Sequence, residues 1–408
     1  MLYQLHELQR AFLNPMTSFA AANARALSDP HNPLSYMPFA NRLAAGYELF
    51  FRLGKEYQKP EFGLHTTEVD GEVVPVTEEV IVDLPFCRLL HFKRAITKRR
   101  AKDPVVLLVA PLSGHHSTLL RDTVRQLIRA HDVYITDWRD ARMVPLSEGP
   151  FHLDDYVAYI QQFIRLLGPD VHCISVCQPT VPVLAAVALM ATQKDPALPR
   201  SMIMMGGPID ARKSPTQVNN LATEKPFSWF ENTVIYQVPA NYPGYLRRVY
   251  PGFLQHAGFV AMNPNRHFDS HHDFYLNLVK GDDEDATEHR KFYDEYNAVL
   301  DMPAEYYLDT IKTVFQEHRL PKGTWSVSGV RVAPEDIKTV ALFTIEGELD
   351  DISGSGQTAA AIALCKGIPK NRKQHFTAPQ CGHYGIFSGR RWREVIYPRI
   401  HDFIRTTA

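Results

Sequence analysis

Short apolar segments rich in β-branched residues alternate with helical patterns along much of this 408-residue chain. The segments that predict strands are 104–110, 132–137, 170–176, 201–207, 339–348 and 373–379. The helical patterns between and after them are 118–130, 153–167, 178–193, 357–366 and 391–406. Because parallel strands need a long crossover connection, this alternation predicts an α/β fold with a mostly parallel central sheet flanked by helices.

The alternation is interrupted once, over residues 208–335, where aromatic residues, proline and helical patterns are frequent. This composition predicts an inserted helical cap, or lid, between the two parts of one core, 76–207 and 336–408. The first part of the core is expected to begin with two short strands on either side of a turn at Pro85.

Residues 1–75 predict a separate helical N-terminal extension. Apolar residues recur at helical spacing from Leu2 to Leu13, and Pro15 is expected to end this first helix. A second amphipathic helix is expected from about Phe39 to Gly54.

Composition narrows the class of protein. Apolar residues make up 45% of the chain, and the net charge of −1 gives no sign of nucleic acid or an anionic membrane as a partner. No segment approaches the roughly 18 apolar residues of a transmembrane helix. The five cysteines are irregularly spaced, and the N-terminus lacks the pattern of a secretory signal. We therefore expect free cysteines in a reducing compartment and a cytoplasmic location.

A candidate nucleophile lies where the predicted strand 170–176 meets the following helix. An α/β-hydrolase places its nucleophile on such a sharp turn, and both Ser175 and Cys177 are near it. Pro179 and Pro182 are tolerated only in a first helical turn, so the helix should begin near Gln178. Cys177 is then at the turn, above a helix N-terminus that favours the thiolate, and Ser175 stays inside the strand.

The acid and the base of a catalytic triad should follow in that order along the chain. His383 lies in a glycine-flanked loop between the last strand and the last helix, where the base is expected. Asp350 follows the preceding strand and is the preferred acid, with Asp351 as the alternative. Such a carboxylate would hold the imidazole in the correct tautomer and stabilise its charged form.

The oxyanion hole of this fold needs two N–H groups, one of them from the residue after the nucleophile. Here that residue is Gln178, and the second donor is expected in the loop after the strand 104–110. Leu112 is preferred, and Ser113 is the alternative. His115 and His116 are expected to line the mouth of the site without acting chemically.

No cofactor or metal is expected. The chain lacks both the G-x-G-x-x-G and the G-x-x-x-x-G-K-[ST] patterns of nucleotide-binding loops. The cluster of histidines and aspartates at 267–273 contains metal-ligand residue types, but typical ligand spacing is absent, so we interpret it as polar cap surface.

Six segments together resemble the intracellular poly(3-hydroxybutyrate) depolymerases. They are APLSGHHSTLLRDTV (110–124), YITDWRDAR (134–142), ISVCQP (174–179), MGGPID (205–210), EGELDDISG (346–354) and CGHYGIFSGRRW (381–392). Matched by position, the resemblance puts the nucleophile, acid and base of the family on Cys177, Asp350 and His383. It implies hydrolysis of a storage polyester through a thioester intermediate, at the surface of polymer granules in the cytoplasm.

Two other functions are compatible with the same residues. Polyhydroxyalkanoate synthases, which use hydroxyacyl-CoA, share the cysteine but have glycines at the positions of Ser175 and Pro179. A non-catalytic granule-associated protein on the same fold is the second alternative. The aromatic cap and the amphipathic N-terminus are candidates for contacting a granule, or else bury their apolar faces on the core or in a homo-oligomer.

Overall fold

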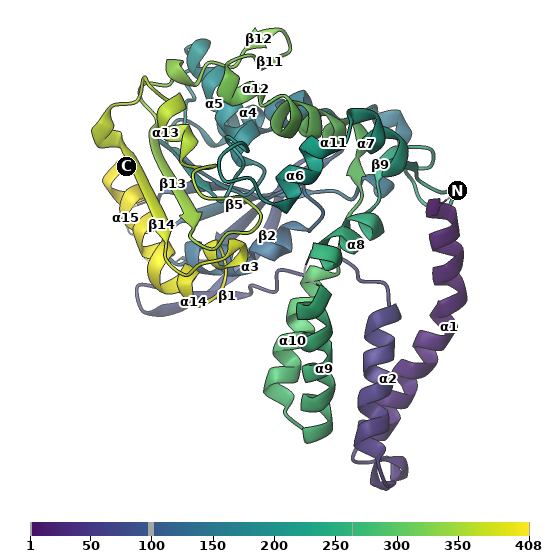
Figure 1. Ribbon diagram of the computed structural model, residues 1–408. Coiled ribbons are helices and arrows are strands. Elements are labelled where there is room, and N and C mark those ends of the chain that lie inside the picture. Colours follow the sequence, from purple (N-terminus) through teal and green to yellow (C-terminus); the bar gives the residue numbers. More distant parts are fainter. Residues whose placement is uncertain (1, 97–101, 263, 408) are drawn as a thin grey trace.

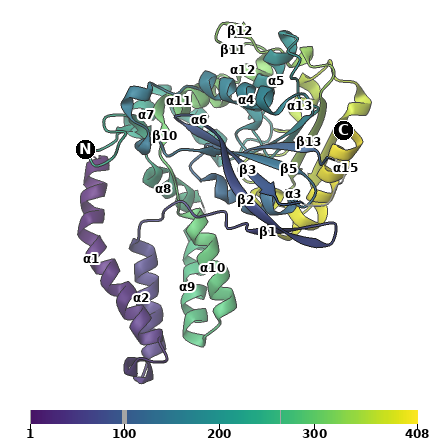
Figure 2. The same ribbon diagram turned by 180° about the vertical axis from the view of Figure 1, so that it is seen from behind.

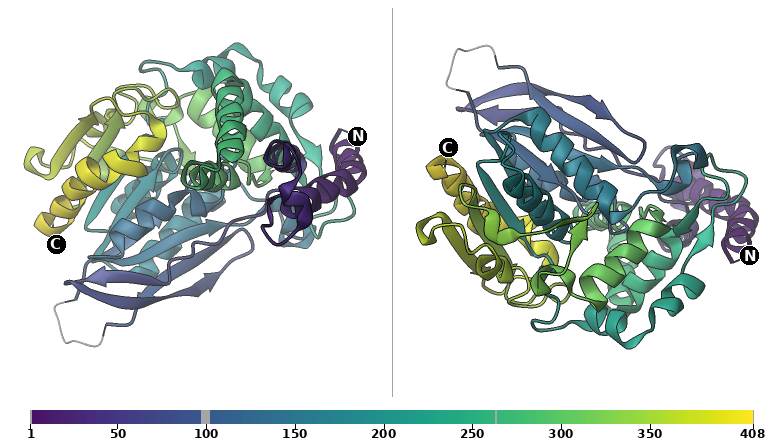
Figure 3. Two further views of the ribbon diagram at one scale, coloured as in Figure 1. Left: turned by 90° about the horizontal axis from the view of Figure 1, so that it is seen from below. Right: turned by 90° about the horizontal axis from the view of Figure 1, so that it is seen from above.

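A nine-stranded sheet is the centre of the computed structural model, which describes residues 2–96, 102–262 and 264–407. Its order is β1-β2-β3-β5-β4-β6-β7-β13-β14, and Figure 3 shows the β1–β2 hairpin at one edge and the C-terminal region at the other. From β5 to β14 all neighbours are parallel, whereas β1, β2 and β3 run antiparallel to their neighbours. The predicted fold class, a mostly parallel sheet flanked by helices, is confirmed.

Most strands begin and end close to the predicted positions. Those of the central sheet are β1 Thr66–Val69, β2 Glu72–Asp83, β3 Cys87–Arg94, β4 Val105–Val109, β5 Asp132–Trp138, β6 Val171–Val176, β7 Ser201–Met205, β13 Ala341–Gly347 and β14 Lys373–Ala378. The boundary predicted at residue 76 is wrong, because β1 and the start of β2 lie within residues 1–75 and already pair with each other in the central sheet. Every residue of β6, β7 and β13 is buried, as expected for parallel strands covered on both faces. Their carboxyl ends therefore meet at one rigid edge of the sheet.

Helices cover both faces of this sheet. They are α3 Arg121–Leu127, α4 Leu153–Leu167, α5 Thr180–Thr192, α13 Ala360–Leu364, α14 Gly389–Arg391 and α15 Tyr397–Thr407. The α5 helix is apolar all round and almost wholly buried, which fits its place at the centre of the core. The rings of Tyr397 and His401 in α15 contact the ring of His131, which follows α3.

The segment between β7 and β13 is an insertion of short elements. It contains α6 Gln217–Glu224, α7 Phe227–Thr233, β8 Tyr236–Gln237, β9 Arg248–Tyr250, α8 Gly252–Met262, α9 Pro264–Lys280, α10 Asp283–Tyr296, β10 Met302–Pro303, α11 Ala304–Thr310, α12 Arg319–Lys322, β11 Ser326–Val327 and β12 Val330–Arg331. A π-helical turn, Ile311–Gln316, extends α11. Figure 1 shows α6, α7, α8 and α11 lying on the body of the molecule, and α9 and α10 extending away from it.

Two helical hairpins, α1–α2 and α9–α10, extend together from the body and are called here the helical projection (Figures 1 and 2). The N-terminal helices are α1 Leu2–Ser28 and α2 Ala40–Gly54, joined through a 3₁₀ turn at Pro33–Tyr36. Side chains of α2 pair with α10: Arg52 with Asp294, and Glu48 with Arg290. None of the described helices is both long enough and apolar enough to cross a membrane.

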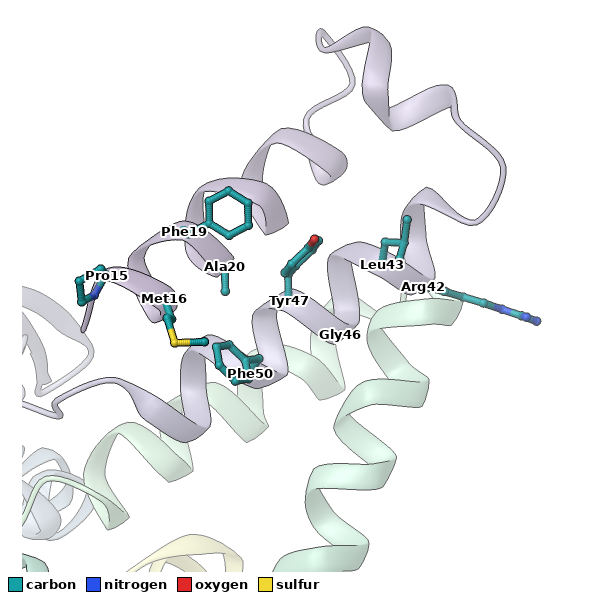
Figure 4. A pocket seen from close by; sticks show the side chains of 9 residues that line it. All are labelled: Pro15, Met16, Phe19, Ala20, Arg42, Leu43, Gly46, Tyr47 and Phe50. Carbon is teal, nitrogen blue, oxygen red and sulfur yellow. The ribbon is translucent and has the colours of Figure 1, made fainter. Parts of the chain in front are cut away.

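The prediction that Pro15 ends the first helix is wrong, because α1 continues through it to Ser28. A proline removes one hydrogen bond within a helix, but packing on both sides can hold the helix together. Here Pro15, Met16 and Ala20 line a groove of about 660 Å³ against α2, with Tyr47 and other residues opposite (Figure 4). Packing against α2 therefore compensates for the backbone hydrogen bond that Pro15 cannot make.

Candidate active site

Cys177 lies at a sharp turn between β6 and α5. Its backbone has φ of +67°, a left-handed conformation that is costly for a non-glycine residue and is typical of a nucleophile elbow. The turn is fixed by the Cys177 N–H, which donates to the Met205 carbonyl at 2.7 Å, and by the Thr180 N–H, which donates to the Cys177 carbonyl at 3.1 Å. Ser175 lies inside β6 and is fully buried. The prolines thus predicted the start of α5 to within two residues.

The close approach of backbones that the elbow requires is made by two glycines at the end of β7. A Cβ atom on Gly207 would overlap the Thr180 hydroxyl and lie 2.5 Å from the Cys177 carbonyl oxygen. Gly206 has φ of +58°, and a Cβ there would lie 3.3 Å from Cε1 of His383. The sequence analysis considered only residues near Cys177 in the chain and did not single out this pair. The double glycine directly after a buried strand was the available signal.

His383 and Asp350 are in direct contact beside the elbow. Nδ1 of His383 lies 2.8 and 3.0 Å from the two carboxylate oxygens of Asp350. The same carboxylate accepts the N–H groups of Ile352 and Ser353 at 2.9 and 2.8 Å, which fixes its orientation. Asp351, the alternative acid, is exposed. The geometry therefore favours Asp350 as the partner of the imidazole.

The imidazole of His383 is also close enough to Cys177 for the sulfur to influence its pKa. Since Nδ1 faces Asp350, Nε2 is the nitrogen left for the sulfur. Burial alone would lower the pKa of His383, but the negative charges of Cys177 and Asp350 outweigh it, and the pKa is raised well above its usual value. The arrangement can hold a proton between the sulfur and the imidazole, as a nucleophile with its general base must.

The predicted oxyanion donors lie next to Cys177. Leu112, Ser113 and Gln178 line the same pocket as the nucleophile. Within the described ranges, no acceptor is found for the backbone N–H of either Leu112 or Gln178, so both can receive a developing negative charge. The backbone N–H of Ser113 also lacks an acceptor among the described residues, so the structure does not decide between Leu112 and Ser113 as the second oxyanion donor.

The pocket above Cys177 has a volume of about 530 Å³ and predominantly apolar walls. Its floor comes from the core and its walls mostly from the insertion: Phe230, Tyr250, Phe259, Met302, Tyr306, Tyr307, Ile311 and Phe315. Sequence reasoning expected an aromatic cap but named none of these residues. Tyr306 in particular donates a hydrogen bond to the Gln178 side chain at 2.5 Å, across 128 positions of sequence. No local pattern signals such a contact.

His115 and His116 do not line the mouth of the site as expected. Both are buried, and burial lowers their pKa values to about 4 and about 3. The ring of His115 stacks on Phe259 at a centroid distance of 4.9 Å, and its Nε2 lies 3.2 Å from the Tyr296 carbonyl. His115 therefore supports the pocket wall from behind.

The histidine- and aspartate-rich segment 267–273 belongs to α9 in the helical projection. Among the described residues no three histidine, cysteine, aspartate or glutamate side chains come close enough together to hold a metal ion. The side chain of His267 lies outside the described part of the structure.

A parallel sheet with this strand order, a nucleophile elbow after β6 and a histidine after the last strand define an α/β-hydrolase. Residues 206–408, which include Asp350 and His383, match the protein family described as PHB de-polymerase C-terminus. Over this part of its length the chain is similar to PHB depolymerases, and the match supports an ester hydrolase.

The chain is also similar to solved structures with which it shares little sequence. The monoacylglycerol lipase of Paleococcus ferrophilus is 14% identical, with a TM-score of 0.45 over 75% of this chain and 97% of that one. A 2-hydroxy-6-oxo-6-phenylhexa-2,4-dienoate hydrolase from Rhodococcus sp. strain RHA1 is 12% identical, with a TM-score of 0.46 over 81% and 99%. No curated protein sequence matches the chain.

Proposed function

We propose that this chain hydrolyses the ester bonds of a poly(3-hydroxybutyrate)-type polyester with Cys177 as nucleophile, His383 as base and Asp350 as acid. One observation carries the proposal: a strained cysteine lines an apolar pocket, beside an imidazole that contacts a buried carboxylate and whose pKa the cysteine raises. The family match supplies the polymer class.

The reaction takes two steps. In the first, His383 takes the thiol proton, the sulfur attacks an ester carbonyl, and the N–H groups of Gln178 and Leu112 stabilise the oxyanion. The tetrahedral intermediate collapses, His383 protonates the departing alkoxide end of the polymer, and a thioester remains on Cys177. In the second, His383 takes a proton from water and the hydroxide attacks the thioester. The intermediate expels the Cys177 sulfur, His383 returns the proton to it, and the carboxylic acid leaves.

The apolar surface of the helical projection is the proposed contact with the polymer granule. Large apolar side chains are exposed there, in particular Leu5, Leu8, Phe12, Met16 and Phe19 on α1, Tyr36, Met37 and Phe39 at the tip, and Leu43 and Phe50 on α2. Exposed apolar surface of this extent marks an interaction site more often than it is neutral. The α8 helix lines the pocket with Phe259 and ends at Met262, and α9 of the projection begins at Pro264. The helical projection is therefore adjacent in the chain to the wall of the catalytic pocket.

The test is acid release from native amorphous granules by the unchanged chain, by Cys177→Ala and by Ser175→Ala. We expect Cys177→Ala to abolish release and Ser175→Ala, which alters the buried neighbour in β6, to retain it. Release that persists in Cys177→Ala would overturn the assignment of the nucleophile. Polymer growth from hydroxyacyl-CoA, with no acid release, would show a synthase instead.

A further inference from the structure

The pocket above Cys177 has its mouth between two helices of the insertion. Its lining residues include four that are exposed, and these are Gln217 and Leu221 on α6 and Gly258 and Ala261 on α8. Because solvent reaches the pocket between these two helices, a polymer chain that approaches Cys177 enters there.

The inner part of the pocket is closed by α7, α11 and the π-helical turn that follows α11. Phe230 of α7 and Ile311 of the turn line the pocket, are buried, and belong to one small hydrophobic cluster. The side chain of Gln316 ties the turn to the end of α6, because it donates to the carbonyls of Ala222 and Lys225 at 3.0 Å each. A chain that enters between α6 and α8 therefore meets a closed wall, and its end lies inside the pocket.

The pocket has no charged lining residue apart from the reacting Cys177, as far as the described part of the chain shows. Its polar lining residues are neutral, Asn219 and Thr310 among them. A linear polyester has two different ends, a hydroxyl group and a carboxylate. Burying a carboxylate without a cationic partner costs far more free energy than burying a hydroxyl group. The closed pocket therefore favours the hydroxyl end.

We propose that the polymer enters this pocket by its hydroxyl end and is cut a small number of repeat units from that end. In the ester between two repeat units, the carbonyl belongs to the unit nearer the hydroxyl end. The thioester on Cys177 then carries the short hydroxyl-end piece, and the rest of the polymer leaves as the alcohol. That alcohol takes its proton from His383, so it has a new hydroxyl end that can enter in turn. This inference rests on the proposed function and adds the direction in which the polymer is shortened.

The volume of the pocket limits the length of the released piece. A repeat unit of 3-hydroxybutyrate occupies roughly 100 Å³ at the packing density of organic crystals, so a pocket of about 530 Å³ has room for about five units at most. We therefore expect short products, and we expect the inner wall at Ile311 to set their length.

The experiment follows cleavage of a linear 3-hydroxybutyrate dodecamer whose carboxyl end is capped as a benzylamide. Mass spectrometry over a time course identifies which fragments carry the cap. The early short products should lack the benzylamide, which should stay on the long remainder. Short products that carry the benzylamide, or fragments of all lengths from the start, overturn the inference. If the chain hydrolyses 4-nitrophenyl butyrate but neither the dodecamer nor granules, it is the proposed function that fails.

A pair of tetramers tests the part played by charge. The hydroxyl end carries an acetyl group in one and a succinyl group in the other, which places a carboxylate at the end that should enter the pocket. We expect kcat/KM for the succinyl tetramer to be lower by about 100-fold, because the pocket offers this charge no partner. Equal values for the two tetramers overturn the inference.

Ile311→Ala tests the closed wall itself. The substitution deepens the inner part of the pocket and should shift the released pieces towards longer ones. Leu308→Ala is the matched control, since Leu308 is a buried member of the same cluster that does not line the pocket. It should leave the product lengths as they are, and thermal unfolding shows whether both variants keep their fold. Equal shifts in the two variants, or no shift in either, contradict the closed wall on which the inference depends.

Discussion

The region around Cys177 and the helical projection differ in how much space surrounds each residue. Next to the nucleophile, a single added carbon on Gly207 would overlap Thr180. In the projection, a Cβ on Gly46 would meet no atom within 4 Å, and Phe12 is 76% exposed. The first region is close-packed like any protein interior, whereas the second displays apolar side chains to its surroundings.

This difference separates two requirements of the proposed reaction. Bond cleavage needs groups held within a few tenths of an ångström, which a close-packed sheet edge provides. Contact with an insoluble, irregular polymer surface needs apolar area but no fixed geometry. Substitutions near Cys177 should therefore change the chemistry or the stability, and substitutions on the projection should change only granule binding.

The largest effect is expected at two neighbouring aspartates. Asp350→Asn removes the carboxylate that orients His383, and kcat should fall about 10⁴-fold. Asp351→Asn alters an exposed side chain that borders the base of the projection, and kcat should remain close to that of the unchanged chain. Steady-state kinetics on 4-nitrophenyl butyrate measures both. Equal losses of kcat in the two variants would contradict the assignment of Asp350 as the triad acid.

The Asp350→Asn variant should also lower the pKa of His383. The Asp350 carboxylate is one of the two negative charges that hold the proton on this imidazole against burial. The titration of His383, followed by nuclear magnetic resonance of labelled histidine, should therefore move to lower pH. Asp351→Asn should leave the titration in place.

The next largest effect is expected on stability, when alanine replaces a glycine in each of the two regions. Gly207→Ala forces atoms into the elbow and should lower the free energy of unfolding by about 3 kcal/mol. Gly46→Ala adds a methyl group to an uncrowded position in α2 and should raise it by about 0.5–1 kcal/mol, because alanine favours the helix. Urea unfolding of both variants measures the difference. Destabilisation by Gly46→Ala would mean that the projection is more tightly packed than the structure shows.

Sequence patterns predicted the parts of this molecule that obey local rules. The strands buried on both faces are short apolar runs, and Pro179 and Pro182 marked the start of α5. The order of Cys177, Asp350 and His383 followed from the chain order of the fold. Each of these inferences depends on a residue and its near neighbours in sequence.

What could not be predicted depends on contacts between distant segments. Pro15 does not end α1 because α2 packs against it. His115 is buried rather than at the pocket mouth because residues of the insertion, Phe259 and Val299 among them, pack and pair against it. Tyr306 meets Gln178 only through the placement of α11. The fold class and the triad candidates were thus accessible from sequence, and the pocket walls were not.

A smaller effect is expected from the exposed face of α1. Phe12→Ser and Leu8→Ser each remove a large apolar side chain that is 76% or 68% exposed. If these side chains insert into the polymer surface, each loss costs about 1.5 kcal/mol of binding, or roughly 10-fold in affinity. Co-sedimentation with native granules measures binding, and hydrolysis of 4-nitrophenyl butyrate should not change.

The matched control is Leu166→Ser, an equally drastic change at a leucine that is 53% exposed on α4 of the core. It should leave granule binding intact. If Leu166→Ser and Phe12→Ser weaken granule binding equally, binding depends on overall surface hydrophobicity and the projection has no special part in it. A shift to a smaller species in solution on Phe12→Ser would indicate a contact between copies of the chain.

The smallest effect is expected where the two hairpins of the projection are tied together. Glu48 pairs with Arg290 through both oxygens, at 2.7 and 3.0 Å, and the pair is partly exposed. Glu48→Gln should lower the free energy of unfolding by about 0.5 kcal/mol, an effect that added salt reduces. Glu79 pairs with Lys93 between β2 and β3, and Glu79→Gln should lower the free energy of unfolding by no more than Glu48→Gln does. A loss in granule binding on Glu48→Gln, without a loss of stability, would show that the α2–α10 pairing shapes the contact surface, and that the projection needs more order than its exposed side chains suggest.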